Sequence, residues 1–510
     1  MDVPSLMRQA MRFNRTRRAI VFEGRSWTFE EAWDRGVRLA NALIAMGVKP
    51  GDRVAGVDDN SIGAVDLFLG AAIAGAVRVP LYARNARDSH AAMLRSTETS
   101  VVLAEEHYEK DLQGVQDELA TLKHVVIRDD GYEDWLASQS DVDPMIEVGP
   151  EDWYVIRHSS GTSGRPKGVG YTQDGWVANS RNWFIRLPTL TQDSVLAHAA
   201  PISHAAGYMF IPVWVAGGTN LLLRSFDARA TLDLIGEYDV THMFLAPSMV
   251  AAMAADDSSR SREYPKLSCI LTGGGPITDA TINVAREVFG DVLHQVYGMT
   301  EATPITIMTP EDWYSTPEGS TPMRSAGKVL PYARVEIRDV DSRAVMPIGE
   351  PGEIWCRCES QMTGYWNDPE QSRDKIAEGW VRSGDIGRLD ENGYLYVLDR
   401  MDDMIVSGGF NIWPAELETI IADHPAVREV AVIGVPHEKW GESPLAVCVV
   451  EDPSAVDGQE IIDLVAKRMG SYLKPTRVEF VRDPLPKTLV GKLSRKTLRD
   501  PHWENRQRGV

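Results

Sequence analysis

Apolar positions recur with a helical period near the start of the chain. Between residues 28 and 47, the apolar side chains fall three or four positions apart, at Trp33, Val37, Ala40 and Ile44. This spacing is typical of the buried face of an α-helix. Thr28 and Glu31 have the spacing of a capping box, and Gly47 and Pro50 are stop signals. The pattern predicts a helix followed by the short strand "RVAGV".

The same alternation of helix and strand signals continues over the first three hundred residues. Short apolar runs stand at "HVVIRD" (124–129), "LAHAAPI" (196–202), "TNLLLRSF" (219–226), "THMFLAPS" (241–248) and "LSCILTGGG" (267–275). Such runs, separated by helices, predict parallel sheets covered by helices. The most apolar stretch, 207–223, is broken by Gly217, Gly218 and Asn220. We therefore expect a buried helix and strand there, and no membrane span.

The pattern changes after about residue 320. Alternating residues and turn glycines in 334–358 and 393–400 predict antiparallel strands. The stretch 414–451 has the pattern of a compact α+β unit. The charged and glycine-containing segment "LDRMDDMIVSGG" (398–409) lies between two regions that can each bury a core. We place a domain boundary there.

Composition and charge narrow the classes of function. A chain of 510 residues is expected to hold more than one domain. Its formal net charge of -20 argues against a general nucleic-acid binder, although residues 482–510 are locally basic and could meet phosphate or form a solvated helix face. The N-terminus lacks an apolar signal core, so secretion is not expected. Reduced, buried thiols in the cytoplasm are the simplest interpretation of the four cysteines, Cys269, Cys356, Cys358 and Cys448.

Five glycine-containing segments carry the candidate chemistry. "SSGTSGRPKG" (159–168) has the glycines, hydroxyls and lysine of a phosphate loop, but not the common spacing of Gly, four residues and Gly-Lys-Ser/Thr. The others are "LTGGGP" (271–276), "YGMTE" (297–301), "RSGDIG" (382–387) and "PKTLVGKLSR" (486–495). Each alone is more often a turn than a site. Their order along the whole chain is much more specific.

Together with "DRMDD" (399–403) and "SGGFNIWPAELE" (407–418), these segments resemble the adenylate-forming superfamily of acyl-CoA synthetases, luciferases and peptide-synthetase adenylation domains. The pattern is most similar to the acid–CoA ligase branch. The resemblance implies an α/β fold with a large N-terminal domain of helix-covered sheets and a β-barrel-like part, residues 1–401. It also implies a small, mobile α+β C-terminal domain, residues 402–510, which carries the catalytic lysine.

The resemblance implies an ATP- and Mg²⁺-dependent ligase that activates an apolar or aromatic acid as an acyl-adenylate, releases pyrophosphate and passes the acyl group to coenzyme A. An amide synthetase that uses an amine as acceptor is the alternative. A non-catalytic nucleotide-binding protein of this fold is a third. The expected partners are the acid, ATP and CoA or an amine, with no nucleic acid, and the protein is expected to be a monomer or a homodimer.

The resemblance also assigns nucleotide-binding residues. Backbone N–H groups and hydroxyls of the first loop can cradle phosphates, and an ammonium group adds charge. These residues are Ser159, Thr162, Ser163, Gly164 and Lys167. The adenine and ribose would be held by Gly274, Gly275, Pro276, Gln295, Tyr297, Gly298, Asp385 and Arg400. Within the last set, Asp385 and Arg400 resemble the pair that grips the ribose.

The remaining assignments concern catalysis and the acid. Thr300 resembles the α-phosphate ligand, Glu301 the magnesium ligand, His204 the residue at the mouth of the acyl pocket, and Lys492 the lysine that bridges carboxylate and phosphate. The expected acyl pocket is lined by Tyr208, Met243, Leu245, Gly273 and Met299. Asp402 matches the hinge of the moving domain, and a CoA tunnel would pass Ser407, Gly408 and Gly409.

Overall fold

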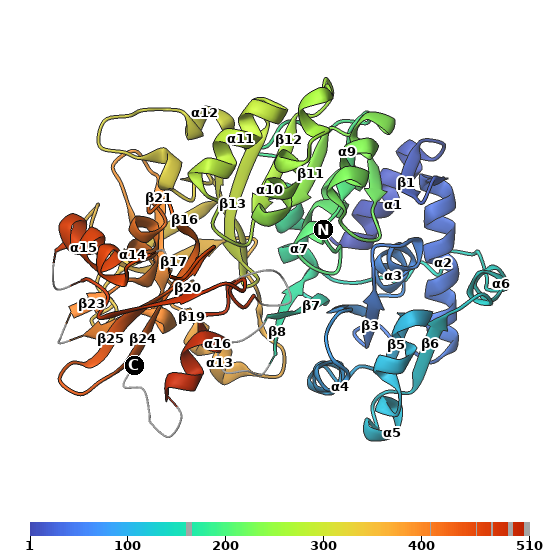
Figure 1. Ribbon diagram of the computed structural model, residues 1–510. Coiled ribbons are helices and arrows are strands. Elements are labelled where there is room, and N and C mark those ends of the chain that lie inside the picture. The colour runs from blue at the N-terminus through green and yellow to red at the C-terminus, as the bar shows by residue number, and fades with distance from the viewer. Residues whose placement is uncertain (160–165, 408–409, 455, 471–472, 488–492, 504–510) are drawn as a thin grey trace. The chain divides into compact units, whose positions relative to one another are not determined.

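The computed structural model describes residues 1–159, 166–407, 410–454, 456–470, 473–487 and 493–503 (Figure 1). It contains two compact units. The first comprises Met1–Val335 and Cys356–Val381, and the second comprises Glu336–Trp355 and Arg382–Val510. The predicted domain boundary between residues 401 and 402 does not coincide with the limits of these units, and it stays a prediction.

A nine-stranded sheet forms one part of the first unit. Its order is β15 (Lys328–Val329), β14 (Ala302–Met308), β13 (Leu293–Met299), β12 (Cys269–Gly273), β11 (His242–Leu245), β9 (Val195–His198), β10 (Thr219–Leu222), β1 (Arg18–Phe22) and β2 (Arg25–Thr28). From β13 to β1 all neighbouring strands are parallel. The predicted parallel sheet is confirmed, and its carboxyl edge presents the ends of β11, β12 and β13. In open α/β sheets this edge is where ligands bind.

A seven-stranded sheet forms the other part of that unit. Its order is β18 (Gly364–Tyr365), β8 (Lys167–Thr172), β7 (Trp153–Ser159), β4 (Val77–Tyr82), β3 (Arg53–Asp58), β5 (Val101–Glu105) and β6 (His124–Arg128). The strands from β7 to β6 are parallel, whereas β8 and β18 are added antiparallel. The antiparallel β7–β8 hairpin therefore carries both ends of the first glycine-rich loop at the edge of a buried sheet.

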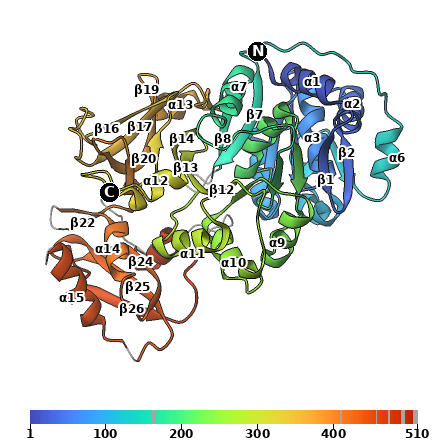
Figure 2. The ribbon, with the colours of Figure 1, turned by 90° about the horizontal axis from the view of Figure 1, so that it is seen from above.

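Helices pack on these sheets around one large core. The central ones are α1 (Val3–Asn14), α2 (Phe29–Ala45), α3 (Ile62–Ile73), α7 (Gln173–Asn182) and α8 (Phe210–Ala216). Figure 2 shows α1, α2 and α3 beside β1 and β2. The predicted capping box of Thr28 and Glu31 is present. At Gly36 a Cβ would lie 2.6 Å from the Leu69 Cβ, so a glycine is required where α2 and α3 meet.

The other helices of the first unit lie at the surface or between strands. They are α4 (Arg87–Ser96), α5 (Val115–Glu118), α6 (Tyr132–Ala137), α9 (Ala228–Glu237), α10 (Pro247–Ala255), α11 (Asp279–Phe289), α12 (Pro310–Trp313) and α13 (Pro369–Lys375). The apolar stretch at 207–223 folds as the buried helix α8 and strand β10, as predicted. No helix in the described part of the chain is long and apolar enough to cross a membrane.

A five-stranded sheet contains the strands predicted after residue 320. Its path is β16 (Ala333–Arg338), β17 (Gly352–Cys358), β20 (Trp380–Leu389) and β19 (Ile376–Ala377), and β21 (Leu395–Arg400) pairs with β20. The β20–β21 and β19–β20 pairs are antiparallel, as expected. The boundaries of the two units fall within β16, β17 and β20.

The rest of the second unit is an α+β structure. Its sheet has the order β23 (Phe410–Ile412), β22 (Ile405–Ser407), β25 (Gly441–Val450) and β24 (Val427–His437), and β26 (Arg477–Val481) pairs with β25. Three helices accompany it: α14 (Pro414–Ile421), α15 (Gly458–Met469) and α16 (Arg495–Arg499). Figure 2 shows α14 and α15 beside this sheet, and their side chains Leu417 and Ile461 join its core. The compact α+β unit predicted around 414–451 is confirmed.

Burial also agrees with the reading of the cysteines. Cys269, Cys356, Cys358 and Cys448 are all buried, and none of them forms a disulfide. Burial raises the pKa of the thiols of Cys269, Cys358 and Cys448. Neutral, enclosed thiols are poor nucleophiles and poor metal ligands.

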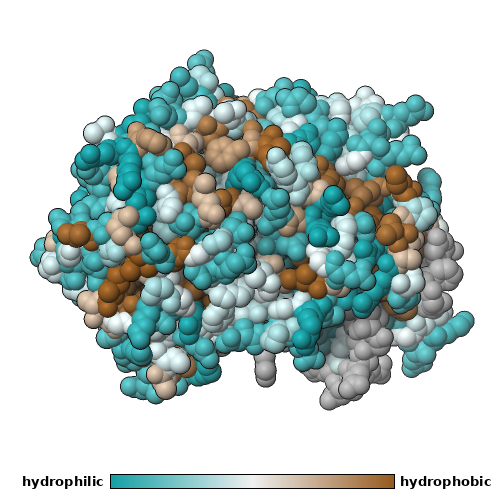
Figure 3. Space-filling model, turned by 180° about the vertical axis from the view of Figure 1, so that it is seen from behind, coloured by the Kyte–Doolittle hydropathy of each residue, from teal (hydrophilic) through white to brown (hydrophobic). Residues whose placement is uncertain are grey.

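On the face drawn in Figure 3, hydrophobic residues are interspersed among hydrophilic ones.

Candidate active site

The first glycine-rich loop joins two strands whose ends the structure places opposite each other. Ser159, the last residue of β7, pairs with Lys167, the first residue of β8. The loop residues Thr162, Ser163 and Gly164 lie outside the described residues. Lys167 Nζ lies 5.3 Å from the ring centroid of Tyr365, on the neighbouring strand β18. The hairpin register thus brings a hydroxyl and an ammonium group of the predicted phosphate loop to one sheet edge.

The same tyrosine also binds the candidate metal ligand. The Tyr365 hydroxyl donates to Glu301 Oε1 at 2.7 Å, and Glu301 is only 8% exposed. Burial and the Glu301 carboxylate raise the pKa of Tyr365, so its hydroxyl stays protonated and continues to donate. Tyr365 therefore lies between an acidic group and a basic group from two motifs that are far apart in the sequence.

A second tyrosine positions the turn that carries Thr300. The Tyr171 hydroxyl donates to the Thr300 backbone carbonyl at 2.6 Å. Sequence reasoning named neither Tyr171 nor Tyr365, because these contacts join residues 129 and 64 positions apart. The only local signal was "TGYW" (363–366), a weak one.

Glycines predicted for the adenine site, and Gly273 predicted for the acyl pocket, lie at the carboxyl ends of β12 and β13. Gly273 pairs with Val296, and a Cβ on Gly273 would lie 2.7 Å from Val296 Cγ1. At Gly298, a Cβ would lie 2.6 Å from Thr303 Oγ1, so the turn after β13 needs a glycine. Gly274 has a positive φ of 80°, whereas a Cβ on Gly275 would meet open space. The close packing explains two glycines, and the open space leaves Gly275 free to face a ligand.

Three further predicted residues share this edge of the sheet. Gln295 and Tyr297 belong to β13, where they pair with Met308 and Thr306 on β14, and both are half-buried. Pro276 follows the glycine run directly. Their positions are compatible with one binding surface, and their contacts with adenine stay predictions.

A tight loop positions the predicted residues His204 and Tyr208. His204 precedes the short helix η2 (Ala205–Met209), and its carbonyl accepts from the Gly207 N–H at 3.0 Å. A Cβ on Gly207 would lie 1.9 Å from the Ile202 carbonyl oxygen, so the loop closes only with glycine. This closure places the Tyr208 ring against Trp176, with ring centroids 5.3 Å apart.

The predicted acyl-pocket residues divide between two faces of the sheet. Tyr208 belongs to the large core, and Met299 packs against it. On β11, Phe244 belongs to that core, whereas Met243 and Leu245 alternate with it and point to the opposite face. Tyr208 and Met299 therefore contact the large core, whereas Met243 and Leu245 are not among its residues, and the role of all four in an acyl pocket stays a prediction.

In the second unit, the predicted ribose pair is adjacent. Asp385 on β20 lies opposite Arg400 on β21, with Arg400 Nε 3.7 Å from Asp385 Oδ1. The Ser383 hydroxyl accepts from the Asp385 N–H at 2.9 Å, which fixes the turn. Both side chains reach solvent, 56% for Arg400 and 18% for Asp385. A carboxylate and a guanidinium at this separation can both contact a diol.

Of the remaining predicted residues, the structure fully describes Ser407 alone. Ser407 ends β22, is buried, and pairs with Gly441 of β25. Gly408, Gly409 and Lys492 lie outside the described residues, as does the side chain of the predicted hinge Asp402.

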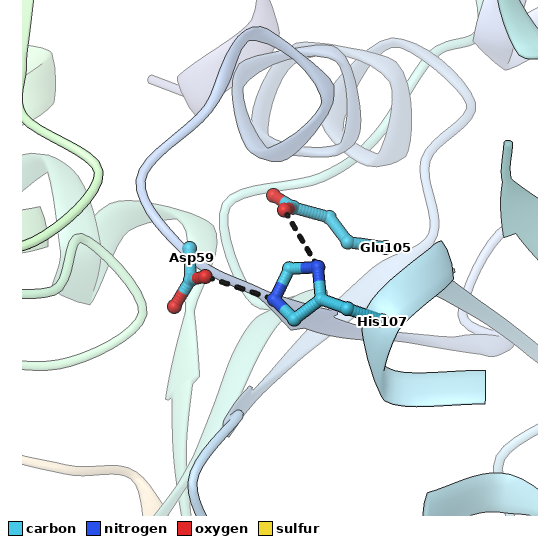
Figure 4. A group of neighbouring side chains, drawn as sticks. All are labelled: Asp59, Glu105 and His107. Carbon is cyan, nitrogen blue, oxygen red and sulfur yellow. Dashed lines mark hydrogen bonds and ion pairs between the residues drawn. The ribbon is translucent and has the colours of Figure 1, made fainter. Parts of the chain in front are cut away.

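One group of possible metal ligands, unpredicted, occurs elsewhere in the described part of the chain (Figure 4). Asp59, Glu105 and His107 present ligand atoms within 4.8 Å of one another. The same carboxylates already bind other groups: Asp59 accepts from the Tyr108 hydroxyl at 2.9 Å, and Glu105 from Arg224 at 2.9 Å. A guanidinium beside the carboxylate opposes a second cation. We interpret this group as an ion-pair network.

Family models and curated relatives both match this chain over most of its length. Residues 6–366 match the model of the AMP-binding enzyme family, and residues 416–492 match that of the AMP-binding enzyme C-terminal domain. A feruloyl-CoA synthase of an Amycolatopsis species is 35% identical over 477 residues, covering 93% of this chain and 94% of the relative.

Two solved structures show the same architecture. ATP-bound MatB from Rhodopseudomonas palustris superposes with a TM-score of 0.89 at 26% identity, covering 99% of this chain and 100% of that one. The amide bond synthetase McbA from Marinactinospora thermotolerans superposes with a TM-score of 0.87 at 29% identity, covering 97% and 99%. The chain therefore belongs to the adenylate-forming AMP-binding enzyme family, and it is an ATP-dependent, AMP-forming ligase.

Proposed function

We propose that this ligase activates an apolar or aromatic carboxylic acid as its acyl-adenylate and then transfers the acyl group to coenzyme A. The observation that carries the proposal is the arrangement around Tyr365, whose hydroxyl binds Glu301 and whose ring lies beside Lys167. A fixed carboxylate and a fixed ammonium on either side of one tyrosine suit a metal–triphosphate substrate. The similarity to a feruloyl-CoA synthase supports an aromatic acid and CoA.

The chemistry explains the need for these groups. A carboxylate is a poor electrophile, and it must attack the α-phosphorus of ATP although both reactants are anions. One bond forms between the carboxylate oxygen and the α-phosphorus, and the bond to pyrophosphate breaks. Catalysis then depends mainly on positioning and on charge stabilisation. We assign the triphosphate to the loop from Ser159 to Lys167, the α-phosphate to Thr300 and the bridging charge to Lys492.

Glu301 suits a hard divalent cation. Tyr365 occupies one lone pair of one carboxylate oxygen, which leaves other lone pairs of the carboxylate able to bind Mg²⁺. When bound, Mg²⁺ neutralises phosphate charge. The ribose would be held by Asp385 and Arg400, and the acid would enter past His204 toward Tyr208.

A second acceptor is kept as an alternative because a solved amide bond synthetase has nearly the same fold and is 29% identical. In that case an amine, and not the CoA thiol, would attack the acyl-adenylate. The sheet and site geometry described above serve both reactions equally.

The test is an assay of pyrophosphate release over a panel of aliphatic, aromatic and arylacetic acids, followed by identification of the products. With an accepted acid, we expect AMP, pyrophosphate and an acyl-CoA when CoA is present. Readily formed amides without any CoA-dependent turnover would favour the alternative. No pyrophosphate release with any acid would reject both.

A further inference from the structure

Arg157 is a buried cation without a carboxylate partner among the described residues. It lies on β7 and is 4% exposed. Its Nη2 donates to the Ser203 carbonyl at 3.5 Å, a weak contact, and its Nη1 is buried with no acceptor. A buried charge is strongly unfavourable unless it is paired and hydrogen-bonded. The other described side chains therefore give Arg157 no counter-charge.

Other buried arginines of the chain are accounted for. Arg8 pairs with Asp143, and Arg338 pairs with Glu336. Arg78 also has buried nitrogens without partners, but it lines a cavity of about 10 Å³ together with Asp58. One water molecule fits in such a space and can join the two charges. Arg157 differs because no carboxylate of the described residues pairs with it.

The surroundings of Arg157 are largely aromatic, and no carboxylate among the described residues pairs with it. The guanidinium carbon lies 4.3 Å from the Tyr208 ring centroid and 5.9 Å from that of Trp176. Two polar atoms of neighbouring residues, Trp176 Nε1 and Ser203 Oγ, are buried and have no hydrogen-bond partner among the described residues. Arginine and the indole nitrogen donate only, so the missing group must accept. A carboxylate also supplies the missing charge, whereas water does not.

The position of this cluster connects it with the acid substrate. Tyr208 is the acyl-pocket residue best supported by the core packing, and Ser203 precedes His204. Burial raises the pKa of the Tyr208 hydroxyl, the Arg157 guanidinium opposes this shift, and the Glu301 carboxylate adds to it. The Arg157 guanidinium thus favours a negative charge beside Tyr208. The stacked Trp176 and Tyr208 rings offer an apolar surface leading to it.

We propose that the acid substrate carries a second carboxylate, besides the one that is activated, and that Arg157 binds this second carboxylate together with Tyr208. This inference rests on the proposed function, since it assigns the part of the acyl pocket beside Tyr208. It narrows the substrate class from an apolar or aromatic acid to an apolar or aromatic dicarboxylic acid. Arg157 is then a specificity residue, and it plays no part in the transfer to AMP.

The test compares each dicarboxylate with its half-amide, which has almost the same shape but one negative charge fewer. The probes are the α,ω-dicarboxylates from succinate to sebacate and the benzene dicarboxylates, assayed with the full chain by pyrophosphate release. For at least one pair, we expect kcat/KM of the dicarboxylate to exceed that of the half-amide by about tenfold or more, through KM. Simple monocarboxylates should show no such discrimination.

Three variants test whether the preference for dicarboxylates over half-amides depends on Arg157. Arg157→Gln should remove it by raising KM for the dicarboxylate while kcat for the half-amide is retained. Arg157→Lys keeps the charge and should keep part of the preference. Arg8→Gln removes a buried arginine that already pairs with Asp143, so the preference should survive. If Arg157→Gln does not fold, stabilisation of the wild-type protein by dicarboxylate and by half-amide, measured as a shift in Tm, decides the question.

Each contrary result overturns the inference in a distinct way. Equal kcat/KM values for every dicarboxylate and its half-amide would rule out recognition of a second carboxylate. Turnover of monocarboxylates in the same assay would leave the proposed function standing. A KM for ATP that rises in Arg157→Gln with every acid would assign Arg157 to phosphate binding. An unchanged preference in that variant would place the selective group elsewhere. No pyrophosphate release with any acid would instead reject the proposed function itself.

Discussion

Arg495 and Glu418 form an ion pair with two parallel hydrogen bonds, from Nε to Oε1 at 3.0 Å and from Nη2 to Oε2 at 2.6 Å. The pair joins α16 to α14, and both side chains are about one-sixth exposed or less, 16% and 14%. The nearby charges of Asp399 and Asp403 also act on Arg495. The chain segment that follows the predicted catalytic lysine is therefore anchored to the body of the second unit.

The first prediction tests this anchor. Arg495→Met leaves the Glu418 carboxylate in a poorly hydrated place, so we expect a loss of about 3 kcal/mol in the free energy of unfolding. Thermal or urea denaturation measures it. The exposed pair of Arg477 and Glu479 is the control, because Arg477→Met should cost less than about 1 kcal/mol. Equal losses in the two variants would contradict the assignment.

The second prediction concerns pH. Burial raises the pKa of Asp399 to about 6, although Arg495 opposes the shift. A raised pKa means that the folded state binds the proton more tightly than the unfolded state, whose pKa is near the ordinary value of about 3.9. The stability that Asp399 contributes is complete below about pH 4 and falls as pH rises toward 6.

The comparison for this pH effect is Asp399→Asn, which cannot titrate. The variant loses one backbone acceptor, so its overall stability is lower, but the difference from wild type should shrink between about pH 4 and pH 6 by up to about 3 kcal/mol. Above that window the difference should be constant. A difference that does not change across the window would contradict the raised pKa.

The third prediction tests the role of Tyr365 as a positioning residue. Tyr365→Phe removes only the hydroxyl that donates to Glu301. If Glu301 binds magnesium, its orientation is then lost, and we expect the apparent affinity for Mg²⁺ in the adenylation assay to fall by about tenfold to a hundredfold. In Glu301→Gln the apparent affinity for Mg²⁺ should fall at least as far. An unchanged Mg²⁺ titration in both variants would remove this pair from the metal site.

The elements that could be predicted from the sequence are those whose burial leaves a local pattern of apolar residues. The helix at 29–45 has one buried face, so its period was visible, and the capping box marked its start. Strand β11 is buried on both faces, as its four buried residues show, so nothing in "HMFL" told which side chains face the pocket. Tyr171 and Tyr365 act through contacts between distant segments, and no local pattern encodes such contacts.

The fourth prediction separates two lysines in the same segment. Lys487 Nζ lies 3.3 Å from Glu429 Oε1, in a partly exposed ion pair. We therefore expect Lys487→Ala to leave adenylation nearly unchanged. Lys492→Ala should nearly abolish adenylation, while thioester formation from chemically prepared acyl-adenylate should survive better. Equal loss of both half-reactions in a folded Lys492→Ala protein would contradict a role confined to the first step.

The last prediction concerns the hinge proposed at Asp402. The next residue, Asp403, is held by Arg499 at 3.1 Å and Arg495 at 3.4 Å, so it belongs with the segment that follows. A rotation between two poses then falls most naturally on the preceding residue, and it needs a large change in φ and ψ. Proline fixes φ at about -65° and restricts the residue before it. Asp402→Pro should hold the chain in one pose.

If the pose held by Asp402→Pro is the adenylating one, pyrophosphate release persists, and CoA thioester formation collapses. A small amine can reach the acyl-adenylate without the rotation, so amide formation should be affected less. Both products are measured from the same variant, with CoA and with an amine. Asp403→Asn is the control, because it weakens the arginine contacts without restricting the backbone, and it should lower stability while both half-reactions continue. Wild-type rates of thioester formation in Asp402→Pro would rule out a hinge at this residue.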